Sequence, residues 1–271
     1  MPDTAPDNGG VDAHDTTDFG YRRVTAAEKP ELVRHVFDSV ARRYDLMNDL
    51  MSGGVHRLWK GALVAKLNPR PPMHFVDVAG GTGDIAFRIL RRLKARAAKS
   101  GGQARAAQNR ATIVDINQHM LDVGRDRALN RGLLAGIDWV CGDATALPLG
   151  DSSVDAYSIA FGIRNVSGME QALSEARRVL RPGGRFVCLE FCPVEGALLR
   201  PLYDAYSFAV VPALGRAVAG DAESYRYLVE SIRRFPGPEK FTALMEAAGL
   251  EQVRVRTLTG GLVALYSGWR L

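Results

Sequence analysis

The sequence predicts an α/β fold with a mostly parallel β-sheet covered by helices on both faces. Short apolar segments typical of buried strands alternate with longer segments in which apolar residues recur at helical spacing. The last two strand-like segments follow each other with only the glycine-containing loop 258–261 between them, which predicts a closing antiparallel hairpin. No repeat or linker interrupts this pattern, so residues 21–271 are expected to form one domain.

The alternation places seven strands and at least six helices. The predicted strands are 74–78, 112–115, 137–141, 154–161, 185–191, 252–257 and 262–267. The predicted helices are 29–48 as one or two segments, 85–93, 120–130, 169–180, much of 201–234, and 241–248. Two segments fall outside the pattern. Residues 1–20 are expected to be a disordered acidic tail, and residues 95–111, rich in Ala, Gly, Gln and Arg, an exposed insertion.

Composition excludes several classes of protein. Hydrophobic residues make up 46% of the chain, yet no run of about 18 apolar residues could form a transmembrane helix. The N-terminus resembles neither a signal peptide nor a mitochondrial presequence, so a cytoplasmic location is expected. The three cysteines, Cys141, Cys188 and Cys192, lack metal-ligand spacing, so we expect reduced thiols and no metal site.

Charge is distributed unevenly along the chain. The net charge is +5, but the first 20 residues hold five of the 30 acidic residues and none of the 35 basic ones, which leaves +10 on the rest. A basic body suits an anionic partner, either nucleic acid or an acidic membrane surface. It also suits a merely solubilising surface, and charge alone does not choose among the three.

A glycine loop, Gly80-Gly81-Thr82-Gly83, follows the first predicted strand. Glycine permits both a tight turn and close approach of the backbone to a ligand at the carboxyl end of the sheet. The third position of the dinucleotide fingerprint is Ala86, a tolerated variant, so the loop alone leaves nucleotide, flavin and methyl-donor sites open. Asp77, two residues before the loop, would repel a pyrophosphate and attract a sulfonium cation with its ammonium group.

Acidic residues also end the next two predicted strands. Asp115 stands where an acid of a βαβ unit accepts hydrogen bonds from ribose hydroxyls. Asp143, followed by Ala144, stands where a carboxylate can accept the adenine amino group. A lone acid at a strand end is often a surface residue. Three acidic residues at the ends of three successive strands, together with the glycine loop, predict a site for S-adenosyl-L-methionine.

Residues 37–271 resemble the ubiquinone/menaquinone biosynthesis C-methyltransferase family. The glycine loop is shared with many methyltransferases, whereas other matching segments are specific to this family: 44–53 with His56, Arg57 and Trp59, then 161–166, 204–208 and 224–232. The resemblance implies a Rossmann-like class I methyltransferase with a seven-stranded sheet, and carries donor contacts onto Thr82, Asp115, Asp143 and Ala144. Many members have a serine where this chain has Ala160, which removes a hydroxyl from the site.

The implied reaction is methylation of a ring carbon of a polyprenylated quinol. The substrate would be 2-polyprenyl-6-methoxy-1,4-benzoquinol in ubiquinone synthesis, demethylmenaquinol in menaquinone synthesis, or both. Such a carbon becomes nucleophilic when a neighbouring hydroxyl approaches the phenolate form, which a fixed cation favours. Arg164 is the candidate for that cation and Asn165 for orienting a substrate oxygen, although both could simply brace the loop. His56, Tyr225 and Asp221 are alternative general bases that the sequence does not rank.

The substrate also predicts partners. An apolar segment, residues 203–214, could line a prenyl channel or belong to the core. A basic body beside such an entrance predicts peripheral binding to the inner face of an anionic membrane. Contacts with other quinone-synthesis enzymes and a homodimer remain open.

Two other functions are compatible with parts of the sequence. A nucleic-acid methyltransferase would suit the basic charge. However, the chain lacks both an Asn/Asp-Pro-Pro-Tyr/Phe segment and a Pro-Cys nucleophile, so no nucleic-acid partner is expected. A non-catalytic scaffold that binds the donor is the second rival. A methyltransferase of another small aromatic compound is the closest alternative among enzymes.

Overall fold

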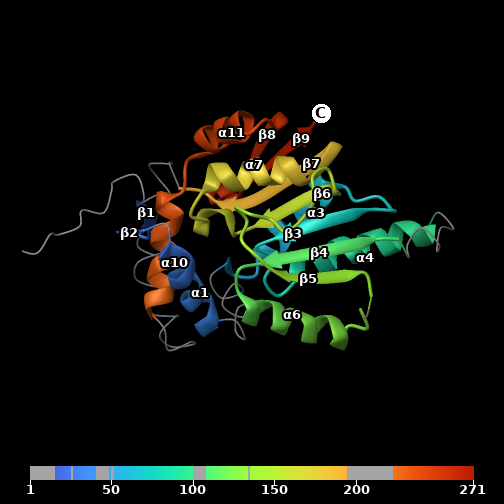
Figure 1. Cartoon of the computed structure of the whole chain (residues 1–271), viewed down its shortest axis with the longest axis horizontal. Helices are drawn as coiled ribbons and strands as arrows, with labels where there is room; N and C mark the ends of the chain where they lie inside the picture. The colour runs from blue at the N-terminus through green and yellow to red at the C-terminus, as the bar shows by residue number, and fades with distance from the viewer. Residues whose placement is uncertain are drawn as a thin grey trace, which may run out of the picture.

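Seven strands form one sheet in the order β5-β4-β3-β6-β7-β9-β8, drawn in Figure 1. The computed structural model describes residues 16–25, 27–40, 49, 52–99, 108–133, 135–193 and 222–271. Strands β3 to β7 run parallel, and β9 lies antiparallel between β7 and β8. The predicted parallel sheet with a C-terminal antiparallel hairpin is therefore confirmed. The strands are β3 (His74–Val78), β4 (Arg110–Asp115), β5 (Ile137–Cys141), β6 (Val154–Ala160), β7 (Leu180–Phe191), β8 (Glu251–Leu258) and β9 (Val263–Arg270).

Helices cover both faces of the sheet, because alternate strand residues point to opposite sides. On one face Phe75 and Ile113 belong to a cluster with residues of α3 (His56–Leu67), α4 (Asp84–Lys99) and α6 (Gln118–Asn130). On the other, Val76 and Val114 belong to a cluster with residues of α7 (Met169–Val179) and α11 (Pro238–Ala247). Figure 1 shows α7 and α11 on one side of the sheet and α6 on the other. None of the described helices is long and apolar enough to cross a membrane.

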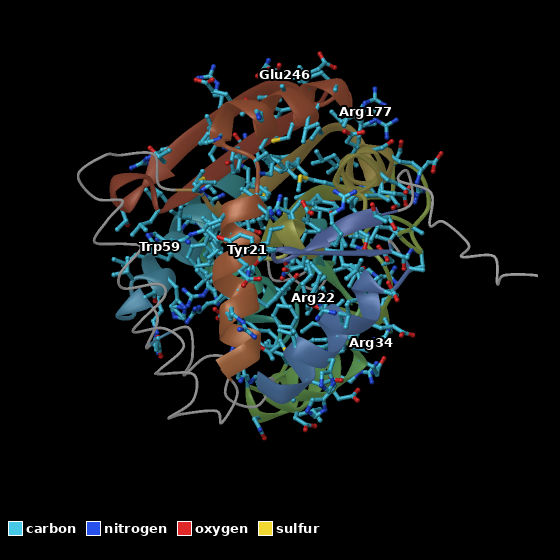
Figure 2. The ribbon with its side chains drawn as sticks, turned by 90° about the vertical axis from the view of Figure 1, so that its left-hand side faces the viewer. Tyr21, Arg22, Arg34, Trp59, Arg177 and Glu246 are labelled. Atoms are coloured by element: carbon cyan, nitrogen blue, oxygen red, sulfur yellow. The ribbon has the colours of Figure 1, made fainter. Side chains whose placement is uncertain are left out.

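A smaller layer stands at the end of the sheet where the parallel strands finish. It consists of a hairpin of β1 (Thr16–Phe19) and β2 (Arg22–Thr25), helix α1 (Lys29–Val40) and helix α10 (Ala222–Arg234). Figure 2 shows this layer in front of the sheet. Phe19 stacks on Tyr227 with ring centroids 4.2 Å apart, and Glu230 accepts a hydrogen bond from the Tyr21 nitrogen at 3.0 Å.

The structure corrects two predicted segments. Residues 16–19 form strand β1, so the expected disordered tail does not extend to residue 20; residues 1–15 lie outside the described part. The expected insertion at 95–111 is in part regular structure. Helix α4 continues to Lys99, with Ala97 buried, and β4 already begins at Arg110. Ala, Arg and Lys are strong helix formers, which explains why the helix continues.

Candidate active site

The site lies where the strand order reverses. Strand β3 is flanked by β4 on one side and by β6 on the other, and the chain leaves β3 and β6 in opposite directions. In open α/β sheets such a switch point opens a crevice beyond the carboxyl ends of the strands. The two loops that border it are tightly apposed. A Cβ placed on Gly162 would lie 2.3 Å from the Cβ of Ala79, so only glycine fits there.

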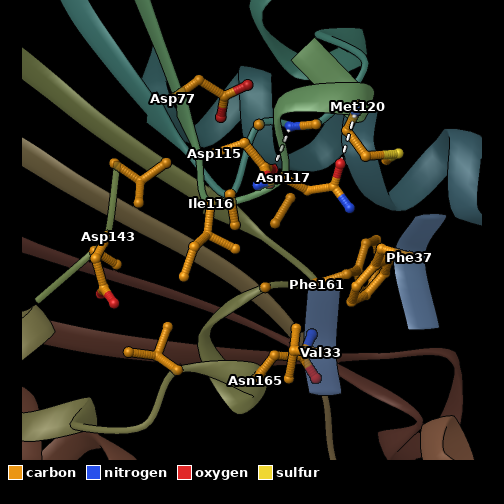
Figure 3. Close-up of a pocket in the computed structure, with 18 of the residues that line it drawn as sticks. Val33, Phe37, Asp77, Asp115, Ile116, Asn117, Met120, Asp143, Phe161 and Asn165 are labelled. Carbon is orange, nitrogen blue, oxygen red and sulfur yellow. Dashed lines mark hydrogen bonds between the residues drawn. The ribbon is translucent and has the colours of Figure 1, made fainter. Parts of the chain in front are cut away.

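A pocket occupies this crevice (Figure 3). Its walls come from the ends of β3, β4, β5 and β6 and from α1, and Lys60 of α3 also lines it. The residues predicted from the sequence that line it are Asp77, Gly80, Gly81, Thr82, Asp115, Asp143, Ala144 and Asn165. Gly83 and Arg164 are not among the lining residues. The structure therefore brings most of the predicted site together.

Asp77 is a buried carboxylate with one unused oxygen. Its side chain is 1% exposed, and its Oδ1 accepts a hydrogen bond from the Ser158 hydroxyl at 2.7 Å. No residue that the structure describes donates a hydrogen bond to Oδ2. Burial raises the pKa of Asp77 to about 7, because the interior disfavours the charged form. An unsatisfied buried carboxylate oxygen is costly, and a cationic ligand in the pocket would satisfy it.

Asp115 fixes the glycine loop. Its Oδ2 accepts a hydrogen bond from the Gly81 nitrogen at 2.8 Å, and its Oδ1 accepts one from the Asn117 nitrogen at 2.9 Å. Burial raises the pKa of Asp115 to about 6, although both backbone donors favour the carboxylate. A Cβ on Gly80 would meet Ile113 at 2.7 Å, so the backbone lies close against the sheet. Each carboxylate oxygen has a second lone pair for a ligand hydroxyl.

Other predicted contacts are partly occupied within the protein. Asp143 Oδ1 accepts from the nitrogen and the hydroxyl of Thr145, both at 2.8 Å. The Thr82 hydroxyl accepts a hydrogen bond from Arg127 at 2.9 Å. Gly83 lies behind the loop, where an added Cβ would fall 3.0 Å from Phe87 and Trp139. Glycine at this position allows helix α4 to pack closely behind the loop.

Arg164 lies in a different place from the one expected. It belongs to the short helix η3 (Ile163–Asn165) and does not line the pocket, and its guanidinium pairs with Glu190 at 2.7 Å. Both side chains are buried, at 3% and 0% exposed. Its Nε also donates to the Ser231 hydroxyl at 3.3 Å, which links the loop to α10. Burial raises the pKa of Glu190, and the Arg164 charge opposes that rise.

Asn165 reaches the pocket itself. Its Oδ1 accepts a hydrogen bond from the Tyr227 hydroxyl of α10 at 3.0 Å. This bond fixes the orientation of the amide. An amide nitrogen held in this way can donate a hydrogen bond to an oxygen of a bound ligand.

Helix α1 closes one side of the pocket, which the sequence did not indicate. Its lining residues are Pro30, Val33, Arg34 and Phe37, and Figure 3 shows Val33 and Phe37 across the cavity from Asp115. Asn117 caps α6 through the Met120 nitrogen at 3.0 Å and donates to Asp38 of α1 at 2.9 Å. The local sequence indicates only that Asn117 caps the helix that follows Asp115. The hydrogen bond from Asn117 to Asp38 joins residues 79 positions apart, so no local pattern indicates that α1 reaches the site.

Of the proposed general bases, His56 has a described side chain, and it does not line this pocket. His56 is buried and lines a separate groove between α3 and α4; its Nε2 lies 2.9 Å from Asp49. Burial lowers the pKa of His56, which favours the neutral ring. Asp221, the side chain of Tyr225 and the prenyl-channel segment 203–214 lie outside the described residues. Ala160 also lines the pocket.

The residues present fit a cationic donor with a ribose and a base. The Asp77 oxygen without a partner among the described residues would be satisfied by a cation. Asp115 and Asp143, on the same wall, can each accept further hydrogen bonds. The glycine loop leaves the backbone bare between them. This arrangement was predicted from the three strand-end acids.

Comparison with known proteins identifies the family. The model of the ubiE/COQ5 methyltransferase family matches residues 24–270. A ubiquinone/menaquinone biosynthesis C-methyltransferase of Methylobacterium nodulans is 56% identical over 259 residues, covering 94% of this chain and 97% of that protein. A mitochondrial 2-methoxy-6-polyprenyl-1,4-benzoquinol methylase of Oryza sativa is 53% identical over 260 residues, covering 94% and 88%.

Solved structures show the same fold at low identity. A SAM-dependent methyltransferase of Thermotoga maritima has a TM-score of 0.59 at 21% identity, covering 88% of this chain and 99% of that one. The [4+2]-cyclase SpnF has a TM-score of 0.56 at 17% identity, covering 88% and 94%, so the fold alone does not fix the reaction. The family match spans most of the chain, and on that ground the chain belongs to the ubiE/COQ5 methyltransferase family.

Proposed function

We propose that this protein transfers a methyl group from S-adenosyl-L-methionine to a ring carbon of a polyprenylated quinol. The substrate class is that of ubiquinone and menaquinone biosynthesis: 2-polyprenyl-6-methoxy-1,4-benzoquinol, demethylmenaquinol or both. The observation that carries the proposal is the row of strand-end carboxylates facing a glycine turn. Relatives named for this reaction match it over nearly their whole length, which supports the same substrate class.

The donor would lie along the ends of three strands. Asp77 would take its ammonium group on the free Oδ2, Asp115 its ribose hydroxyls and Asp143 with Ala144 its adenine. Gly80, Gly81 and Thr82 would contact it through the glycine loop. When bound, S-adenosyl-L-methionine supplies an electrophilic methyl group. A cationic ligand beside Asp77 would also offset the desolvation cost of its buried carboxylate.

Asn165 and Arg164 would act on the quinol side with different roles. Asn165 lines the pocket, and its fixed amide would donate to a quinol oxygen and orient the ring. Arg164 would act as a positioning residue, because its charge is already engaged by Glu190. It would hold the loop that carries Asn165, instead of stabilising a phenolate by direct contact.

Peripheral membrane binding would bring the enzyme to its lipid-like substrate. A second groove, which we call the α3–α4 groove, is lined by the cations Arg57, Arg88, Arg91, Lys94 and Arg131, with the apolar Phe87, Leu90 and Leu133. Arg131 stacks over the Phe87 ring at 4.8 Å. Arg57 pairs with Asp49 and Arg88 with Asp84, whereas no ion pair joins Arg91 or Lys94 to a described residue. Cations above an apolar floor suit anionic headgroups.

Quinone profiling tests the proposed function. A strain lacking the gene should accumulate a quinone precursor lighter by one methylene, and its identity reveals the substrate. The wild-type gene should restore the methylated quinone, and Asp115→Ala should not. Asp126→Ala on the exposed side of α6 is the matched control and should restore it. Restoration by Asp115→Ala would favour the scaffold function, and an unchanged quinone profile in the deletion strain would exclude a quinol substrate.

A further inference from the structure

Lys60 places a buried ammonium group at the wall of the donor pocket. The residue is 5% exposed and lines the pocket from helix α3. Its Nζ lies 2.9 Å from Asp84 Oδ2 at the start of α4. An ammonium group is expensive to bury and persists in a protein interior only where anions or other acceptors surround it.

The carboxylate that pairs with Lys60 also serves a second cation. Asp84 is shared, because its Oδ1 also accepts from Arg88 Nε at 3.1 Å. His56, one turn earlier on α3, is disfavoured in its charged form, since burial and the nearby Lys60 charge both lower its pKa. An ammonium has three N–H donors, and only the one to Asp84 has a partner among the described residues. Room for a further anionic acceptor remains.

Lys60 and Asp77 bring opposite charges to the same pocket. Asp77 offers an unused carboxylate oxygen, and Lys60 offers unused N–H donors. Both lie toward the β3–β6 end of the crevice, because Asp77 belongs to β3 and α3 packs on β6 and β7. Asp115 and Asp143 stand further along, after β4 and β5. A zwitterionic amino-acid group is the ligand fragment that presents one charge to each of Lys60 and Asp77.

We infer that Lys60 binds the carboxylate of the donor's amino-acid end while Asp77 binds its ammonium group. The inference rests on the proposed function, since it assigns a residue to the same donor. Its consequence is selectivity. The site should distinguish nucleosides that carry a complete amino acid from those that lack the carboxylate. Asp84 would hold Lys60 in place, and Arg88 would keep Asp84 ionised.

Calorimetry with two ligands tests the inference without turnover. S-adenosylhomocysteine carries the whole amino-acid group, and its decarboxylated analogue keeps the amine alone. A charge-assisted hydrogen bond contributes about 1.5–3 kcal/mol, so the wild-type protein should prefer the first ligand by about 10- to 100-fold. Lys60→Met should lose this preference by weakening S-adenosylhomocysteine alone. Its unchanged affinity for the analogue, within about threefold, would show that the site is folded.

Further variants and outcomes make the test decisive. Lys60→Gln keeps an N–H donor for Asp84 and should behave as Lys60→Met, so it serves if Lys60→Met does not fold. Lys66→Met, on the same helix but outside the pocket, should keep the wild-type preference. If Lys60→Met weakens the binding of both ligands equally, or leaves the preference unchanged, the inferred role of Lys60 is wrong. The proposed function is then unaffected. Failure of the wild-type protein to bind either ligand would overturn the proposed function and the inference with it.

Discussion

The buried side chain of Asp77 lowers the stability of the ligand-free protein and offers an acceptor to a cationic ligand. Its carboxylate is buried with one oxygen lacking a partner among the described residues, which is unfavourable in the ligand-free protein. The same oxygen is what a cationic donor needs. Unsatisfied polar groups of this kind are often found where a ligand completes the site. The raised pKa of Asp77 expresses this cost in a form that can be measured.

Asp77→Asn should therefore stabilise the ligand-free protein in a pH-dependent way. The pKa of Asp77 is about 7 in the folded protein, against about 4 in an unfolded chain. Below pH ~4 the group is protonated in both states. As the pH rises toward 7 the unfolded chain releases its proton first, so the wild-type protein loses stability.

Thermal unfolding of the two ligand-free proteins between pH 4 and 8 measures this effect. The melting temperature of Asp77→Asn relative to wild type should rise up to about pH 7 and then level off. The stability difference gained is at most about 4 kcal/mol. The variant should also fail to bind S-adenosylhomocysteine at pH 8. A difference in melting temperature that does not change with pH would contradict the assignment of the raised pKa to Asp77.

The buried pair of Arg164 and Glu190 makes a second prediction at this scale. Arg164→Met leaves Glu190 buried without its counter-ion, which should cost about 3–5 kcal/mol of unfolding free energy. Replacing both residues by methionine should recover much of that loss, because no uncompensated charge remains. Urea unfolding of the single and double variants measures both values. A single variant as stable as the double one would show that the pair is not coupled.

The positioning role of Arg164 has its own kinetic readout. If Arg164 acts through the Asn165 loop, the double methionine variant should lose turnover while its affinity for S-adenosylhomocysteine stays close to that of wild type. Asn165→Ala should show the same pattern. Loss of donor affinity in the double variant would instead place the pair in the donor site.

At the scale of elements, the site depends on two strained loops. Ala79 has φ 49° and Phe161 has φ 59°, conformations that non-glycine residues rarely adopt. Such strain costs about 1–3 kcal/mol for each residue and persists only where the surroundings enforce it. Here the enforcing contact is the close approach of Gly162 to Ala79. It holds the ends of β3 and β6 together beside the pocket.

Gly162→Ala should break that contact. The added Cβ would lie 2.3 Å from the Ala79 Cβ, so the loops must separate. We expect a loss of about 1–3 kcal/mol in stability together with weaker donor binding, measured by urea unfolding and calorimetry. Gly150→Ala is the matched control, because a Cβ there meets nothing within 4 Å. Normal donor affinity in Gly162→Ala would show that the apposed loops do not shape the site.

The sequence predicted the elements better than the contacts between them. Local periodicity located the seven strands of the large sheet to within about two residues at most ends, but not the β1–β2 hairpin, and the strand-end acids located one wall of the pocket. Arg164 was placed in the site because it follows β6. Its side chain turns instead toward Glu190 on the neighbouring strand, a pairing 26 residues away that leaves no local pattern. The contacts of helix α1 and of Lys60 with the site were missed for the same reason, since they are long-range.

The whole molecule carries its charge asymmetrically, and the α3–α4 groove is the surface where this asymmetry has the clearest consequence. Like charges repel one another, so five cations around one groove, of which Arg57 and Arg88 are already paired with carboxylates, suit an anionic partner. Leu58, at 74% exposed, lies on α3 beside Arg57 and adds an apolar contact. A membrane with anionic lipids offers both the headgroup charge and the apolar layer that these side chains suit.

Vesicle sedimentation tests this surface. The protein should bind phosphatidylglycerol vesicles but not phosphatidylcholine vesicles, and 0.5 M salt should weaken binding because it screens the charges. Reversing Arg91 and Lys94 to glutamate should reduce binding by about tenfold or more, given about 1 kcal/mol for each basic residue near the surface. The control reverses Lys240 and Arg256, exposed cations on α11 and β8, with the same change in net charge. Equal losses in both double variants would mean that overall charge, and not the α3–α4 groove, attracts the membrane.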